Sequence, residues 1–116
     1  MDLKLTMGEF VYMTNKLSLN GQYKLYTFDC NLAPSTPDEL YGTPIAATVP
    51  GNVELDYMAT GLLPDLYVAD NIDAARTLEG KDFWYVGQFD FTPNKSAHKR
   101  TLVFDGVDCI AEYFVN

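Results

Sequence analysis

The segment from Val49 to Asp65 constrains the fold most tightly, because it combines a rigid turn with the start and the stop of a helix. Pro50 and Gly51 close an apolar run over 45–49, which predicts a short strand that ends at this turn. Asn52 is a residue type that caps helices, and Gly61 and Pro64 are placed to end one. The apolar residues at i, i+3, i+4 and i+7 predict the buried face of this helix: Leu55, Met58, Ala59 and Leu62.

The rest of the chain consists of short apolar runs separated by turn residues. Asn20-Gly21 predicts a turn before a strand over 22–28, and residues 33–42 are typical of an exposed loop. Residues 81–91 alternate throughout, which predicts a central strand with one aromatic face. We expect further strands over 100–104 and 110–115, and one or two helical turns over 72–78. Five or six strands with one helix predict an all-β, mainly antiparallel fold, a sandwich or a barrel rather than βαβ units.

The composition excludes several classes of partner. The chain has 116 residues, which is one domain at most, and its 16 acidic and 8 basic residues give a net charge of −8. Lys99-Arg100 is the only basic cluster, so we expect neither nucleic acid nor an anionic membrane as a partner. No apolar run is long enough to span a membrane, and Met1 to Lys4 does not start a signal peptide, which leaves a periplasmic or secreted location open.

The two cysteines, Cys30 and Cys109, stand far apart in the sequence. Neither belongs to a CxxC or Cys/His pattern, so no metal site is predicted, and no cofactor motif is found either. Two small buried hydrophobic side chains are a better interpretation than a disulfide.

No catalytic motif is found in the sequence. The only histidine, His98, lies in a predicted turn and is typical of a solvated loop residue. Glycoside hydrolysis needs two carboxyl groups beside the scissile bond, but capping or solvation accounts for each close pair of acids. These pairs are Glu54 and Asp56, Asp70 and Asp73, and Asp105 and Asp108.

One loop carries the residue types of a sugar subsite. Tyr67, Asp70 and Asn71 bring an aromatic ring, a carboxylate and an amide close together, and Trp84 follows shortly after as a second platform. The alternative is structural: Asp70 and Asn71 shape a turn, and Trp84 fills the core.

Several segments stand in a specific order along the chain, and the order extends over 17–116. They are Leu19-Asn20-Gly21-Gln22-Tyr23, Val49-Pro50-Gly51, Gly61-Leu62-Leu63-Pro64-Asp65, Asp82-Phe83-Trp84-Tyr85, Phe104-Asp105-Gly106-Val107-Asp108 and Ala111-Glu112-Tyr113-Phe114-Val115-Asn116. Together they resemble the N-terminal sugar-binding domain of family 2 glycoside hydrolases, the β-mannosidase and β-galactosidase group. The loop Leu66-Tyr67-Val68-Ala69-Asp70-Asn71 lacks the second Pro and the Gly of the β-mannosidase branch, so the resemblance leaves the sugar open.

The resemblance implies a partial jelly-roll, galactose-binding-domain-like β-sandwich over 17–116 with one short helix near 52–61, preceded by an N-terminal arm of uncertain structure over 1–16. It implies that Asn71, and more loosely Asp70, lies near the mouth of a catalytic pocket. The catalytic carboxylates would belong to a separate barrel domain of the same polypeptide, so this chain would be a non-catalytic fragment of a retaining exo-β-glycosidase. Two alternatives remain: a free-standing carbohydrate-binding module that uses Tyr67 and Trp84, and a structural domain that contacts no sugar.

Overall fold

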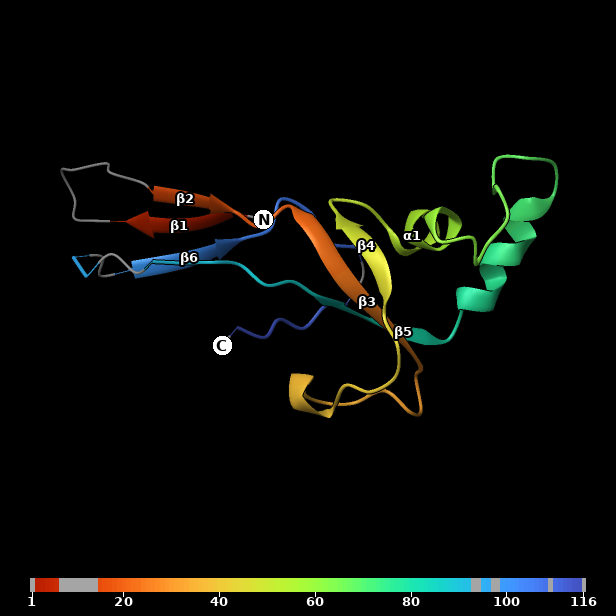
Figure 1. Cartoon of the computed structure of the whole chain (residues 1–116), viewed down its shortest axis with the longest axis horizontal. Helices are drawn as coiled ribbons and strands as arrows, with labels where there is room; N and C mark the ends of the chain where they lie inside the picture. The colour runs from red at the N-terminus through yellow and green to blue at the C-terminus, as the bar shows by residue number, and fades with distance from the viewer. Residues whose placement is uncertain (1, 7–14, 93–94, 97–98, 109, 116) are drawn as a thin grey trace. The chain divides into compact units, whose positions relative to one another are not determined.

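The computed structural model describes residues 2–6, 15–92, 95–96, 99–108 and 110–115. They belong to two compact units, Met1–Asn20 with Phe89–Asn116, and Gly21–Gln88. Figure 1 shows the elements of both units. The elements of the second unit are β3 (Gly21–Asp29), the 3-10 turn η1 (Pro37–Glu39), β4 (Ile45–Val49), α1 (Val53–Ala59), the 3-10 helix η2 (Asn71–Leu78) and β5 (Lys81–Val86).

The first unit contains a three-stranded antiparallel sheet in the order β2-β1-β6. Its strands are β1 (Asp2–Thr6), β2 (Asn15–Ser18) and β6 (Lys99–Val103). The central strand β1 pairs with β2 from Asp2 opposite Ser18, and with β6 from Asp2 opposite Val103. The sheet therefore joins the start of the chain to a strand about a hundred positions later in the sequence.

The second unit is built on a three-stranded antiparallel sheet in the order β4-β3-β5. The central strand β3 places Leu25 opposite Tyr85 of β5 and opposite Ile45 of β4. Leu25 is 1% exposed, so its side chain alone contributes about 1.5–3 kcal/mol through burial. Leu25 and Thr27 are two positions apart on β3 and therefore share one face of the sheet. Helix α1 is hydrogen-bonded to this face, because the Tyr57 hydroxyl donates to Thr27 Oγ1 at 2.8 Å.

Helix α1 begins and ends where the turn residues predict. The Asn52 side chain accepts a hydrogen bond from the Leu55 backbone N–H at 2.9 Å, which caps the first turn. At the other end Gly61 has φ +76°, and the N–H groups of Gly61 and Leu62 donate to the carbonyls of Met58 and Tyr57. This pattern is a Schellman motif, and glycine suits its left-handed position because it has no Cβ.

A hydrophobic cluster follows α1 along the chain and contains Leu63, Leu66 and Leu78. All three are buried, and Phe83 of β5 packs against them. The cluster thereby connects the end of α1, the loop before η2, and the end of η2 to one face of the sheet. Val53, Tyr57 and Met58 of α1 complete the contact from the helix side.

The mainly antiparallel β class with a short helix is confirmed, and so are the strand over 45–49, the strand over 22–28 and the turns over 72–78. Four expectations about secondary structure and packing were wrong. The strand predicted over 81–91 ends at Val86 and lies at an edge of its sheet, because its pairing with β3 runs only from Asp29–Lys81 to Lys24–Val86. The strand predicted over 110–115 is irregular.

The third error concerns the buried face of α1. Leu55 and Leu62 are 42% and 57% exposed, whereas Asp56 is 5% exposed. Of the predicted stripe, Met58 packs against the hydrophobic cluster, but the helix is rotated so that the side of Val53, Asp56 and Tyr57 faces the sheet. Cys30 is also exposed and carries a free thiol, contrary to the expectation of a buried side chain. Cys109 lies outside the described residues.

Candidate functional site

The loop 65–73, which follows α1 and ends in the first turn of η2, contains three of the four predicted site residues, Tyr67, Asp70 and Asn71. Leu66 anchors the start of this loop in the hydrophobic cluster. Pro64 stands just before the loop and prevents α1 from continuing in this direction. The loop is thus attached to the core immediately before its polar residues.

Asp65 braces the loop through both its side chain and its backbone. Its Oδ1 accepts from the Tyr67 N–H at 3.0 Å, and its carbonyl accepts from the Val68 N–H at 3.2 Å. The same carbonyl accepts from Asn71 Nδ2 at 3.0 Å. An aspartate that bonds the backbone two residues on forms an Asx turn. This role was not predicted from the sequence, although an aspartate after a proline is a turn signal.

The loop reverses direction at Ala69, which has φ +49°. The Asn71 N–H donates to the Val68 carbonyl at 3.1 Å, and the Asp73 N–H donates to the Asp70 carbonyl at 3.0 Å. Each bond closes a tight turn, so the backbone from Asp65 to Asp73 is hydrogen-bonded in consecutive steps. These bonds order the backbone from which the loop side chains project.

The side chains that this loop presents are polar and aromatic. Tyr67 is 84% exposed and Asp70 is exposed, while Asn71 is half-buried. The bond to Asp65 uses one N–H of the Asn71 amide, and an amide also has a second N–H and a carbonyl with two lone pairs. A hydroxylated ligand could bond to both the amide and the Asp70 carboxylate.

Trp84 lies elsewhere in the second unit. It stands opposite Tyr26 in the register of β5 with β3. Successive side chains of a strand point to opposite faces, and the adjacent Phe83 packs against the cluster below the loop. Trp84 therefore points to the other face of the sheet, and the structure does not bring it together with Tyr67, Asp70 and Asn71.

Asp56 is a buried carboxylate that sequence analysis assigned only to the helix start. Its Oδ1 accepts from the Thr48 N–H at 3.0 Å, and its Oδ2 accepts from the Tyr85 hydroxyl at 3.1 Å. Burial and this hydrogen bond raise the pKa of Tyr85 well above its ordinary value. The three residues join α1, β4 and β5, which indicates a structural role.

The described part of the chain contains no group of three or more His, Cys, Asp or Glu side chains arranged to hold a metal ion. Within the same residues, no helix has both the length and the apolar character that a membrane span requires.

Comparison with known protein families gives a match over residues 18–116. The family is described as glycosyl hydrolase 2 galactose-binding domain-like. The matched range covers all of Gly21–Gln88 and the described loop from Asp65 to Asp73. No curated protein and no solved structure matches the chain.

Proposed function

Because the chain belongs to the glycosyl hydrolase 2 galactose-binding domain-like family, we propose that it serves as the non-catalytic front domain of a retaining exo-β-glycosidase. The enzyme would be β-mannosidase-like or β-galactosidase-like. The two catalytic carboxylates of that enzyme would lie in a separate domain. The present chain would contribute the loop from Tyr67 to Asn71 to the rim of the sugar pocket.

The braced loop is the observation that carries this proposal. Asp65 fixes the backbone on both sides of the turn and holds the Asn71 amide by one N–H. A pre-organised amide binds a sugar hydroxyl without the entropic cost of ordering a flexible side chain. Asp70, directly before it, adds a carboxylate that accepts hydrogen bonds from a second hydroxyl.

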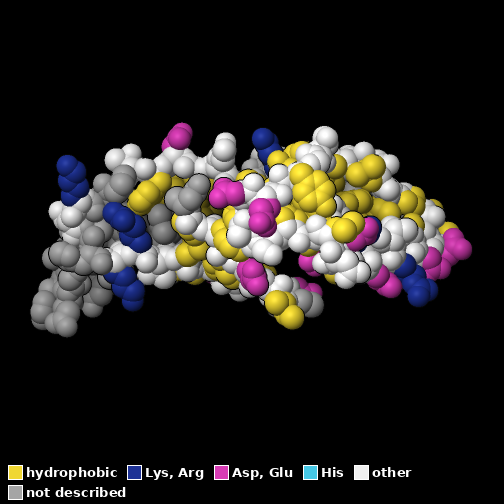
Figure 2. Space-filling view, turned by 90° about the horizontal axis from the view of Figure 1, so that it is seen from below, with side chains coloured by type: hydrophobic (Ala, Val, Ile, Leu, Met, Phe, Trp, Pro, Cys, Tyr) yellow, Lys and Arg dark blue, Asp and Glu magenta, His cyan; other side chains and the backbone are white. Residues whose placement is uncertain are grey.

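Exposed apolar side chains support the idea that other domains pack against this one. Hydrophobic side chains lie open among acidic ones on the face shown in Figure 2. Near the candidate loop, Tyr67, Val68 and Ile72 are 84%, 53% and 58% exposed. Apolar residues grouped at a surface mark contact with a partner, and here we propose the catalytic domain of the same enzyme.

The test compares two variants of the full enzyme that both remove one bond from the loop. Asn71→Ala removes the amide, and Asp65→Ala removes the bond from Tyr67 N–H to the Asp65 carboxylate while leaving the Asn71 side chain in place. Each loses a loop hydrogen bond, so each should lower the stability by about 1 kcal/mol. Asn71→Ala should also reduce kcat/KM strongly, by about tenfold or more, because a substrate hydroxyl loses its partner. Asp65→Ala should reduce kcat/KM much less, because it keeps the Asn71 amide and the Asp65 carbonyl that holds it.

The readouts are kcat/KM on an aryl β-mannoside and an aryl β-galactoside, together with the melting temperature. Equal kcat/KM for Asn71→Ala, Asp65→Ala and wild type would contradict the pocket-lining role. That outcome would leave a domain that stabilises the enzyme without contacting sugar. Turnover of either glycoside by the 116-residue chain alone would contradict the non-catalytic role.

A further inference from the structure

The acidic residues of the chain are concentrated in its second unit. Gly21–Gln88 contains ten of the 16 acidic residues but only three of the eight Lys and Arg residues. Residues 25–75, all of which the structure describes, include eight acidic residues and no Lys, Arg or His. Like charges at this density repel one another and destabilise a compact unit. A cation that relieves this repulsion must come from outside the segment.

The basic residues of the same unit do not neutralise the loop 65–73. Arg76 Nε lies 3.6 Å from Glu79 Oε1, and Lys81 is paired with Asp29. The ion pairs of the described residues include neither Asp70 nor Asp73, and both of these side chains are exposed. The loop therefore presents negative charge that its own unit leaves uncompensated.

Exposed apolar side chains stand between these acids. Tyr67, Val68 and Ile72 are all largely exposed. The Asn71 N–H donates to the Val68 carbonyl at 3.1 Å, so a tight turn brings the backbone of Val68 close to the residue before Ile72. Val68 and Ile72 are aliphatic and offer no hydrogen bond to a sugar hydroxyl. These two side chains therefore favour contact with a protein surface.

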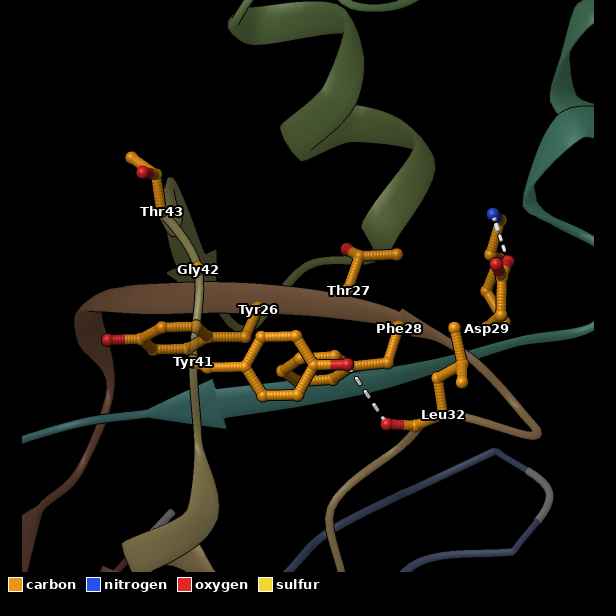
Figure 3. Close-up of a pocket in the computed structure, with 9 residues that line it drawn as sticks. Tyr26, Thr27, Phe28, Asp29, Leu32, Tyr41, Gly42 and Thr43 are labelled. Atoms are coloured by element: carbon orange, nitrogen blue, oxygen red, sulfur yellow. Dashed lines mark hydrogen bonds and ion pairs between the residues drawn. The ribbon is translucent and has the colours of Figure 1, made fainter.

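A second exposed apolar region of the same unit lacks this combination. Tyr41 packs against Phe28, with ring centroids 4.7 Å apart, beside a cavity of about 250 Å³ (Figure 3). Leu32 lines this cavity and is 63% exposed. Asp29, which follows Phe28 in the sequence, already has Lys81 as its cation. This region therefore provides the comparison for the loop.

We infer that the surface of Tyr67, Val68, Ile72 and Asp73 docks onto a face of the catalytic domain where Lys and Arg residues flank an apolar centre. The inference rests on the proposed function and adds the chemistry of the partner face. Opposite charges fix the register of two surfaces, and interfaces between domains of one chain are rich in polar groups. A second copy of the chain fits less well, because a symmetric contact would bring the same acids of both copies together.

The experiment measures how fast a protease separates the front domain from the catalytic domain in the full enzyme. This rate follows the population in which the two domains are apart. Asp73→Lys sets a cation against the expected Lys and Arg residues, and cleavage should become about tenfold faster or more. Asp73→Asn only removes the charge and should give a smaller acceleration.

Asp38→Lys is the matched control for the charge. Asp38 is also an exposed acid in the first turn of a 3-10 helix of the same unit. Its reversal should leave the cleavage rate within about twofold of wild type. Raising the ionic strength should accelerate cleavage of the wild type, because attraction is screened, and slow cleavage of Asp73→Lys, because repulsion is screened.

The apolar part of the surface is tested by Ile72→Ala against Leu32→Ala. Both remove an aliphatic side chain of similar exposure, at 58% and 63%. Ile72→Ala should accelerate cleavage by about threefold or more, because it removes apolar area from the contact. Leu32→Ala should leave the rate unchanged.

Equal cleavage rates for wild type, Asp73→Lys and Asp38→Lys would overturn the inference. It would also be overturned if Asp73→Lys converted an enzyme dimer into a monomer at an unchanged cleavage rate, since the surface would then join two copies. Proteolysis needs no catalysis, and Ile72 and Asp73 lie outside the loop from Tyr67 to Asn71. Failure here is therefore distinguishable from unchanged kcat/KM in the Asn71→Ala enzyme.

Discussion

The Tyr85 hydroxyl donates a hydrogen bond to Asp56 Oδ2 at 3.1 Å and so joins the edge strand β5 to helix α1. Asp56 is 5% exposed, and its other oxygen accepts from the Thr48 N–H of β4. One carboxylate therefore connects three elements whose sequence positions span residues 48 to 85. A buried carboxylate is tolerated only when its oxygens are hydrogen-bonded, so the three partners depend on one another.

Removing this carboxylate should destabilise the chain strongly. Asp56→Ala leaves the Thr48 N–H and the Tyr85 hydroxyl without their acceptor, and we expect a loss of about 2–3 kcal/mol in the free energy of unfolding. Tyr85→Phe removes one bond and should cost about 1 kcal/mol. Urea unfolding of both variants and of the double variant measures the coupling, which should be about 0.5–1.5 kcal/mol.

Tyr67→Phe is the matched control for this cycle. It also removes a tyrosine hydroxyl, but Tyr67 is 84% exposed, so the stability should stay within about 0.5 kcal/mol of wild type. Strict additivity of Asp56→Ala and Tyr85→Phe would show that the two side chains do not act as a pair.

The stability should also depend on Tyr85 at alkaline pH. Its pKa is raised in the folded chain by burial and by the bond to Asp56, whereas an unfolded tyrosine titrates at about pH 10. The contribution of Tyr85 is therefore complete below about pH 10 and is lost as the pH rises toward the folded pKa. The stability gap between wild type and Tyr85→Phe should shrink over this range.

Urea unfolding at stepped pH values above and below about pH 10 measures this gap. The other tyrosines and the lysines titrate in both proteins, so the difference between the two isolates Tyr85. A gap that stays constant or widens with rising pH would argue that the folded chain does not hold the phenol in its protonated form.

The start and the end of helix α1 were predictable from local turn residues, whereas the face that it buries was not. Asn52 and Gly61 act through hydrogen bonds with residues at most four positions away, so the sequence reveals them directly. The buried face depends on Thr27, Thr48 and Tyr85, which bond to the helix from distant strands. A stripe of four apolar residues does not contain that information.

The same distinction applies to the candidate site. Tyr67, Asp70 and Asn71 were predictable as a group because they are adjacent in the sequence. The position of Trp84 was not predictable. Its direction depends on which face of β5 packs against the hydrophobic cluster around Leu63. The cavity next to Tyr41 was missed because its walls come from a strand, a loop and a second strand that carry no shared motif.

The rotation of α1 leads to a prediction about leucine substitutions. Leu63 is 8% exposed within the hydrophobic cluster, and Leu63→Ala should cost about 2–5 kcal/mol in the free energy of unfolding. Leu55→Ala and Leu62→Ala remove side chains that are about half exposed and should each cost less than about 1 kcal/mol. Chemical denaturation of the three variants checks this ranking. An equal loss in the free energy of unfolding for Leu55→Ala and Leu63→Ala would mean that Leu55 is buried, as the apolar stripe predicted.

The last prediction concerns the turn that joins β4 to α1. A Cβ placed on Gly51 would lie 2.6 Å from the Thr48 carbonyl oxygen, which is backbone and cannot rotate away. Gly51→Ala must therefore shift Thr48, whose N–H also bonds to Asp56, and we expect a loss of about 1–3 kcal/mol.

Gly106→Ala provides the comparison, because an added Cβ there meets no described atom within 4 Å and requires no left-handed backbone. Its effect should stay within about 0.5 kcal/mol. In a domain of this size, each kcal/mol lowers the melting temperature by about 4–8 °C, so thermal unfolding separates the two variants clearly. If Gly51→Ala melts at the same temperature as Gly106→Ala, the close approach of the Thr48 carbonyl does not restrict position 51 to glycine. The bond from Thr48 to Asp56 would then tolerate movement of the end of β4.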